Sequence, residues 1–126
     1  MPYLVDTDVL IDVSRSNEAA IDFLDQLGDS WLISIITALE LIVGARSKKE
    51  VAQIDQLIAA YSAIPLTAKI GNASYALLRQ FAKSHGLRVF DSLIAATAID
   101  GAFTLVTKNK KHFQMIENLK LEVPRY

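Results

Sequence analysis

Three acidic residues far apart in the chain each lie beside or within an apolar run. Asp6 follows one such run, Glu40 lies inside another, and Asp91 follows a third. A fourth polar segment, which ends in Asn109, comes after Thr104–Val106. Carboxylates are costly to gather in apolar surroundings unless a cation or a proton compensates them. If folding brings these side chains together, we expect them to hold a hard divalent cation, a site suited to phosphate chemistry.

Each acid also has a purely structural interpretation. Asp is a favoured N-cap residue, and both Asp6 and Asp91 come before helical patterns. Thr37 and Glu40 have the spacing of a capping box, in which the glutamate bonds back to the start of the helix. Asp8 has two possible interpretations: a second pocket residue beside Asp6, or a first-turn acid favoured by the helix dipole. The metal interpretation therefore depends on these acids meeting at one place.

The elements that must position these residues follow from the apolar pattern. Buried strands are predicted at residues 3–5, 31–34 and 103–106, a peripheral strand at 63–66 and a half-exposed edge strand at 119–123. Helices are predicted around residues 20–27, 51–61, 67–86 and 91–101. This alternation predicts a mostly parallel sheet covered on both faces. Because sites in such sheets form beyond the carboxyl ends of the strands, Asp6, Asp91 and Asn109 are expected at one edge.

Length and composition set the broad class of protein. The 126 residues suit one domain spanning residues 1–126, and a hydrophobic fraction of 52% supports a sizeable core. No apolar stretch reaches the ~18 residues of a membrane span, and the first residues have no signal-peptide pattern. The lack of cysteine excludes thiolate metal sites, and two histidines fit a histidine-rich zinc site poorly. We therefore expect a cytoplasmic protein with no membrane segment.

The net charge of -1 conceals an asymmetry along the chain. Residues 1–30 carry seven acids and one base, whereas the remainder carries seven acids and twelve bases. Overall neutrality argues against strong non-specific binding to nucleic acid. A local basic rim stays open, and the alternative is that these lysines and arginines only solvate the surface.

Four segments together resemble the PIN-domain nuclease family. Asp6-Thr7-Asp8-Val9-Leu10-Ile11 is similar to its opening motif, residues 34–45 to its second acidic segment, residues 90–98 to its third and residues 105–113 to its fourth. Order, spacing and total length agree, so the resemblance covers essentially the whole chain. Small single-domain members of the family are mostly VapC-type toxins of type II toxin–antitoxin pairs, and the chain resembles this group.

The resemblance implies a fold and a reaction. The family fold is a three-layer α/β/α sandwich around a mostly parallel sheet, and its members cleave single-stranded RNA with Mg²⁺ or Mn²⁺ by metal-activated water. On matching positions, the metal ligands are Asp6, Glu40 and Asp91, and Asn109 completes the catalytic set. Many relatives have Asp where this chain has Asn109. The loss of that charge implies weaker binding of a second metal rather than an inactive site.

The same resemblance assigns supporting residues and partners. Residues expected to line the pocket or to support its ligands are Thr7, Asp8, Ser92 and Thr107. Candidates for steering the RNA backbone are Arg46, Lys108 and Lys110. Such toxins usually form homodimers through an apolar helical face, and a small antitoxin protein holds them inactive.

Two alternatives remain open at this point. A strand followed by Asp6-x-Asp8 is similar to the nucleophile motif of haloacid-dehalogenase-type phosphatases, in which Asp6 forms an aspartyl-phosphate and Asp8 is the general acid. That family also needs a later pair of adjacent acids after a strand, and this sequence has none. The second alternative is a non-catalytic PIN-like binding module, in which Asn109 marks a degenerate metal site.

Overall fold

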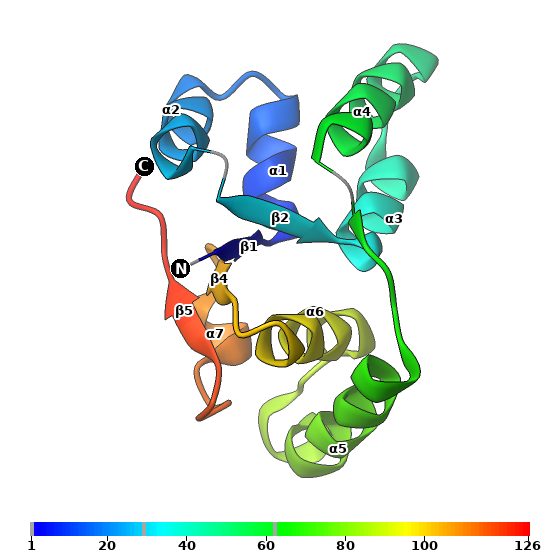
Figure 1. Cartoon of the computed structure of the whole chain (residues 1–126), viewed down its shortest axis with the longest axis vertical. Coiled ribbons are helices and arrows are strands. Elements are labelled where there is room, and N and C mark those ends of the chain that lie inside the picture. Colours follow the sequence, from blue (N-terminus) through cyan, green and yellow to red (C-terminus); the bar gives the residue numbers. More distant parts are fainter. Residues whose placement is uncertain (1, 29, 62) are drawn as a thin grey trace.

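A parallel sheet runs through the middle of the computed structural model, which describes residues 2–28, 30–61 and 63–126 (Figure 1). Within these residues the sheet has five short strands: β1 (Tyr3–Val5), β2 (Trp31–Ser34), β3 (Ala63–Ile64), β4 (Thr104–Val106) and β5 (Lys120–Glu122). Their order is β3-β2-β1-β4-β5, and every neighbouring pair is parallel. The predicted parallel sheet is confirmed, with β3 and β5 at its two edges.

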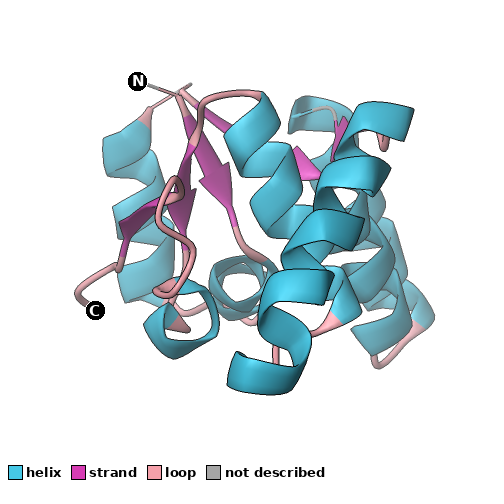
Figure 2. Cartoon of the chain, turned by 90° about the horizontal axis from the view of Figure 1, so that it is seen from below, coloured by secondary structure: helices cyan, strands magenta, loops and turns pink. Residues whose placement is uncertain are grey.

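Helices cover both faces of this sheet and make a three-layer α/β/α arrangement. In the described residues they are α1 (Thr7–Ser14), α2 (Glu18–Leu27), α3 (Ile35–Gly44), α4 (Lys48–Tyr61), α5 (Ala68–His85), α6 (Val89–Asp100) and α7 (Lys110–Phe113). Helices α1 to α4 lie on one face and α5 to α7 on the other (Figure 1). Figure 2 shows the strands enclosed between the two helical layers. None of the described helices has the length and apolar character that a membrane crossing requires.

The alternation of side chains along each strand builds two separate cores. Leu4 and Leu105 point to one face, where they pack with Ile94 of α6. Val5 and Val106, the next residues along, point to the other face and pack with residues of α1 to α4. The two strands β1 and β4 are therefore apolar on both sides, which explains their uninterrupted apolar runs in the sequence.

Helix α5 begins and ends as its sequence predicts. The Thr67 hydroxyl caps the first turn by accepting a hydrogen bond from the Ile70 amide at 3.1 Å. Gly86 ends the helix in the left-handed conformation, with φ of 69°. A side chain at this position is strained, so glycine is the natural residue for the C-terminal turn.

Helix α6 begins earlier than predicted. It starts at Val89 rather than at residue 91, and Arg88 occupies the N-cap position without a side-chain hydrogen bond to the helix. The interpretation of Asp91 as an N-cap, directly after a strand, is therefore wrong. Val89 and Phe90 are exposed residues of the first helical turn, whereas the apolar run suggested a buried strand.

Helix α3 also begins before the predicted cap. Ser34, the last residue of β2, is the N-cap, and its hydroxyl accepts a hydrogen bond from the Ile36 amide at 3.0 Å. Glu40 therefore lies in the middle of the helix, and the capping-box interpretation of Thr37 and Glu40 is wrong. Its carboxylate is free for a different contact.

Candidate active site

The carboxylates that the sequence singled out line one cavity. This pocket, of about 360 Å³, lies beyond the carboxyl ends of β1 and β4, between α1, α3 and α6. Its lining residues are Asp6, Thr7, Asp8, Ile11, Glu40, Arg88, Val89, Phe90, Asp91, Asn109 and His112. The parallel topology thus brings residues from positions 6 to 112 to one wall.

Asp6 is the most deeply placed of these acids. It is 5% exposed and caps α1, and its Oδ1 accepts a hydrogen bond from the Thr7 amide at 2.8 Å. Its Oδ2 accepts a hydrogen bond from the Thr107 hydroxyl at 2.7 Å. The Asp6 amide in turn donates to the Val106 carbonyl at 2.8 Å, which ties the end of β1 to the end of β4. Both carboxylate oxygens are therefore held in fixed positions.

The segment after β4 fastens a second acid to the same wall. The Lys108 amide donates to Asp8 Oδ2 at 2.9 Å, and the Asn109 amide donates to the Thr107 hydroxyl at 3.1 Å. Asp8 also accepts a hydrogen bond from the Val9 amide at 2.7 Å. Asp8 is thus both a first-turn residue of α1 and a pocket residue, so its two open interpretations hold together.

Glu40 reaches the pocket from α3 through a threonine on α1. The Thr7 hydroxyl donates to Glu40 Oε1 at 2.7 Å and lies 3.1 Å from the Thr37 hydroxyl. These contacts join the two helices at the cavity. Thr7 therefore supports Glu40 with its side chain and Asp6 with its amide.

Asp91 is held less firmly than Asp6. Its Oδ2 lies 3.4 Å from His112 Nδ1, and its side chain is 22% exposed. Burial raises the pKa of Asp91, while the nearby His112 and Arg88 oppose this rise. Arg88 brings a positive charge to a wall that is otherwise acidic.

The pocket disfavours several negative charges at once. Burial and the neighbouring Asp8 carboxylate raise the pKa of Asp6 to about 7, although the Thr107 hydrogen bond acts against the rise. Burial likewise raises the pKa of Asp8. A divalent cation or bound protons would relieve this repulsion.

The family follows from a comparison with known proteins. Residues 3–118 match the model of the PIN domain. The chain belongs to the PIN-domain family. It is similar to Ribonuclease VapC10 of Mycobacterium tuberculosis, with 37% identity over 120 residues that cover 93% of this chain and 90% of the relative. It is also similar to Ribonuclease VapC1 of Methanocaldococcus jannaschii, with 34% identity over 95% of this chain and 85% of the relative.

Solved structures give the same assignment. A toxin–antitoxin complex from Klebsiella pneumoniae contains a chain with a TM-score of 0.83 and 28% identity, over 98% of both chains. VapBC2 from Rickettsia felis, bound to a DNA fragment from its promoter, has a TM-score of 0.79 and 29% identity, also over 98% of both chains. The PIN-like sandwich predicted from the sequence is therefore confirmed.

The donor atoms of this PIN domain fit a hard cation in kind. Four carboxylates and one side-chain amide line the wall, and their oxygens are ligands that Mg²⁺ prefers. Among the described residues, no group of three Asp, Glu or His side chains stands close enough to enclose a metal ion. Mg²⁺ commonly binds through one or two carboxylates and keeps several waters, so an open wall suits it better than a closed cage.

One predicted pocket residue of the PIN domain lies elsewhere. The Ser92 hydroxyl donates to the Val89 carbonyl at 2.6 Å and lies 2.5 Å from the Ser74 hydroxyl of α5. Ser92 therefore belongs to the contact between α5 and α6 rather than to the pocket wall. Thr107 is buried behind the wall and acts through Asp6.

The three predicted RNA-steering residues of the PIN domain are outside the pocket wall. Arg46 pairs with Glu50 at 3.0 Å, and Lys108 pairs with Asp12 at 2.6 Å. Lys110 is an exposed first residue of α7. Their role in steering the RNA backbone stays a prediction.

Two wall residues were missed or undervalued. Arg88 is the N-cap residue of α6 and lies three residues before Asp91, so its place in the pocket follows from where the helix begins. His112 follows two lysines, a sequence context typical of a surface residue, and it lies half-exposed beside Asp91. A correct start of α6 is the signal that identifies Arg88 from the sequence.

Proposed function

We propose that this PIN domain is an endoribonuclease that hydrolyses phosphodiester bonds in single-stranded RNA and requires Mg²⁺ or Mn²⁺. The observation that carries the proposal is the shared wall of Asp6, Glu40 and Asp91, in a chain 37% identical to a protein named a ribonuclease. Phosphodiester hydrolysis develops negative charge at the phosphate, which an acidic wall alone opposes. A cation held by the acids reconciles the two.

The side chains have distinct tasks in this proposal. Asp6, Glu40 and Asp91 would hold the cation, directly or through its bound waters, and the cation would supply an activated water and compensate negative charge on the phosphate. Thr107 and Thr7 keep the Asp6 oxygens oriented. Orientation matters because supporting contacts of this kind typically change metal affinity or activity by ~10- to 100-fold.

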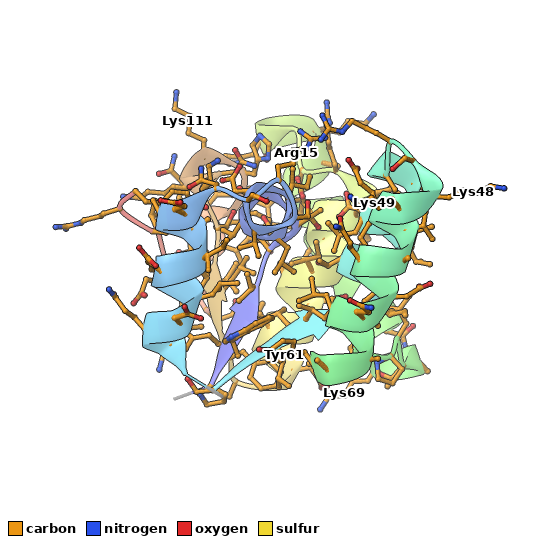
Figure 3. The ribbon with its side chains drawn as sticks, turned by 90° about the horizontal axis from the view of Figure 1, so that it is seen from above. Arg15, Lys48, Lys49, Tyr61, Lys69 and Lys111 are labelled. Carbon is orange, nitrogen blue, oxygen red and sulfur yellow. The ribbon has the colours of Figure 1, made fainter. Side chains whose placement is uncertain are left out.

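The remaining wall residues act on the substrate. Asn109 offers an amide oxygen to water or to the cation, and Arg88 offers a guanidinium to a phosphate. Figure 3 shows Arg15, Lys48 and Lys111 toward the end of the molecule where β1 leads into α1, while Lys69 lies at the opposite end. Basic side chains on the end of the molecule to which the strands lead are compatible with an anionic substrate.

We further propose that the chain is the toxin of a toxin–antitoxin pair, acts in the cytoplasm and forms a homodimer. The similar solved chains come from toxin–antitoxin complexes, which supports a small antitoxin as partner.

Cleavage of a labelled single-stranded RNA tests the enzymatic proposal. We expect products with Mn²⁺ or Mg²⁺ and none with EDTA. Asp6→Asn and Asp91→Asn should each lower the rate by more than the ~100-fold typical of supporting residues, because they remove cation ligands. The matched control is Asp100→Asn, since Asp100 lies at the far end of α6 and pairs with Lys69 at 3.2 Å. This control should cleave as the parent does.

The same experiment separates the alternatives. A folded protein that binds RNA but cleaves none would support the non-catalytic binding module. A covalent phosphate trapped on Asp6 would support the phosphatase alternative and contradict the nuclease.

A further inference from the structure

The first turn of α6 exposes two apolar side chains beside the acid pocket. Val89 is 58% exposed and Phe90 is 55% exposed, and both line the pocket wall. Beyond this turn the helix is buried on almost all sides, so the exposed ring is an exception within its own element. A phenyl ring left in water forgoes the free energy of burial, which makes it available to a ligand.

A second, apolar cavity adjoins the pocket at this ring. It measures about 270 Å³, lies between α3 and the start of α6, and is lined by Ile36, Leu39, Glu40, Val43, Gly44 and Phe90. It shares Glu40 and Phe90 with the acid pocket. The ring of Phe90 therefore stands at the boundary between a polar cavity and an apolar one.

The positively charged side chain of Arg88 lies on the polar side of the same turn. Arg88 lines the acid pocket and is two residues from Phe90. Together with His112, it supplies the basic side chains of that wall among the residues described. Planar guanidinium groups bind phosphate oxygens through paired hydrogen bonds.

We propose that this turn binds one nucleotide of the RNA next to the cleaved bond, an inference that rests on the proposed function. Arg88 binds the phosphate, and the base enters the apolar cavity and stacks on Phe90 opposite Leu39. A nucleotide joins a negatively charged phosphate to a flat base. The polar cavity offers the Arg88 guanidinium to the phosphate, and the apolar cavity offers the Phe90 ring to the base. Because every base has a stacking face, the subsite positions the strand rather than reading its sequence.

Binding of RNA with a missing base tests this subsite. Fluorescence anisotropy would measure the dissociation constant of a labelled single-stranded RNA, with Ca²⁺ in place of Mn²⁺ and a gel to verify that the strand stays intact. A matched series of RNAs has the same sequence, and each member lacks the base at one position. Circular dichroism melts would verify that each variant is folded.

The expected pattern is a coupling between protein and base. Phe90→Ala should weaken binding of intact RNA about tenfold, in the range known for base stacking, while Phe90→Trp keeps it within about twofold. At one position, the abasic ribose should weaken the parent by a similar factor and leave Phe90→Ala unchanged. The control is Tyr75→Ala, which removes a 67% exposed ring of α5 and should change nothing.

Arg88→Gln should behave differently, because a phosphate contact does not depend on the base. It should weaken intact and abasic RNA equally and reduce the salt dependence of binding by about one phosphate contact. Phe90→Ala should leave that salt dependence unchanged.

Other outcomes would overturn the subsite. If Phe90→Ala and an abasic ribose at every position each lower RNA affinity by independent factors that multiply, Phe90 does not stack on a base. The proposed nuclease function is unaffected by that result. If Phe90→Ala changes the sedimentation coefficient but not RNA binding, the ring belongs to an interface between copies of the chain. If the parent neither binds nor cleaves RNA, the proposed function and the subsite fail together.

Discussion

Asp6 and Asp91 line the same pocket but are held in opposite ways. Asp6 is 5% exposed, and both its oxygens accept hydrogen bonds within 2.8 Å. Asp91 is more exposed, and its contact is with a histidine at 3.4 Å. One acid is thus a fixed anchor in the core of the sheet, and the other has room to adjust to a ligand. The site thus combines a rigid half, built by β1 and β4, with a looser half on α6.

Thr107→Val should have the largest effect on the rigid half. The change removes a donor and leaves Asp6 Oδ2 buried without its partner, a defect that costs about 1–3 kcal/mol. We also expect cleavage to fall by ~10- to 100-fold, because Asp6 loses its orientation. Urea denaturation and initial cleavage rates would measure both. An unchanged rate together with unchanged stability would contradict the anchor role of Asp6.

The pH dependence of stability should come from the same half. The folded pKa of Asp6 is raised to about 7 from an ordinary value of 3.8, so between these values the folded state binds more protons than the unfolded state. The free energy of unfolding should therefore fall as the pH rises from about 4 to about 7. Asp8 and Asp91 have raised pKa values and act in the same direction.

Asp6→Asn isolates the contribution of one acid. The amide stays neutral, so the fall in stability between about pH 5 and about pH 8, measured with EDTA present, should be smaller in this variant than in the parent. Equal falls in the two proteins would show that Asp6 ionises in the folded state as it does in the unfolded chain.

Ser92→Ala tests a residue that the sequence analysis placed in the pocket and that the structure places outside it. The Ser92 hydroxyl contacts Ser74 and the Val89 carbonyl, so its loss should lower stability by about 1 kcal/mol. Cleavage should stay within about twofold of the parent, because the contact joins α5 to α6. A large loss of activity at unchanged stability would show that Ser92 acts in the pocket, as the sequence predicted.

His112→Ala should have the smallest effect on folding. The contact of His112 with Asp91 is half-exposed, and exposed contacts of this kind contribute about 0–1 kcal/mol. A melting temperature within a few degrees of the parent is the expected result. A loss of stability as large as that of Thr107→Val would show that the part of the site on α6 is held as firmly as the part on β1 and β4.

The two halves of the site also differ in how far the sequence predicted them. Apolar runs mark β1 and β4 because both strands are buried on two faces, and residues after parallel strands share an edge. That reasoning brought Asp6 and Asn109 to the pocket. Asp91 was assigned to the pocket by the same argument, but it lies there because it is in the first turn of α6.

Contacts that depend on exact helix starts were beyond the sequence. The run at Val89 and Phe90 is apolar yet exposed, so its pattern suggested a strand. Ser34 competes with Thr37 for the cap of α3, and the spacing of Thr37 and Glu40 favoured the wrong one. Arg88 was missed for the same reason, since its place in the pocket follows from the geometry of the α6 terminus.

A crystal structure with Mn²⁺ would test most directly whether the two halves act on one cation. We expect an anomalous peak in the pocket, bound by carboxylate oxygens of Asp6 and Asp91 either directly or through one water, and no such peak in Asp6→Asn. Mn²⁺ found only outside the pocket, in crystals of a protein that still cleaves RNA, would contradict it.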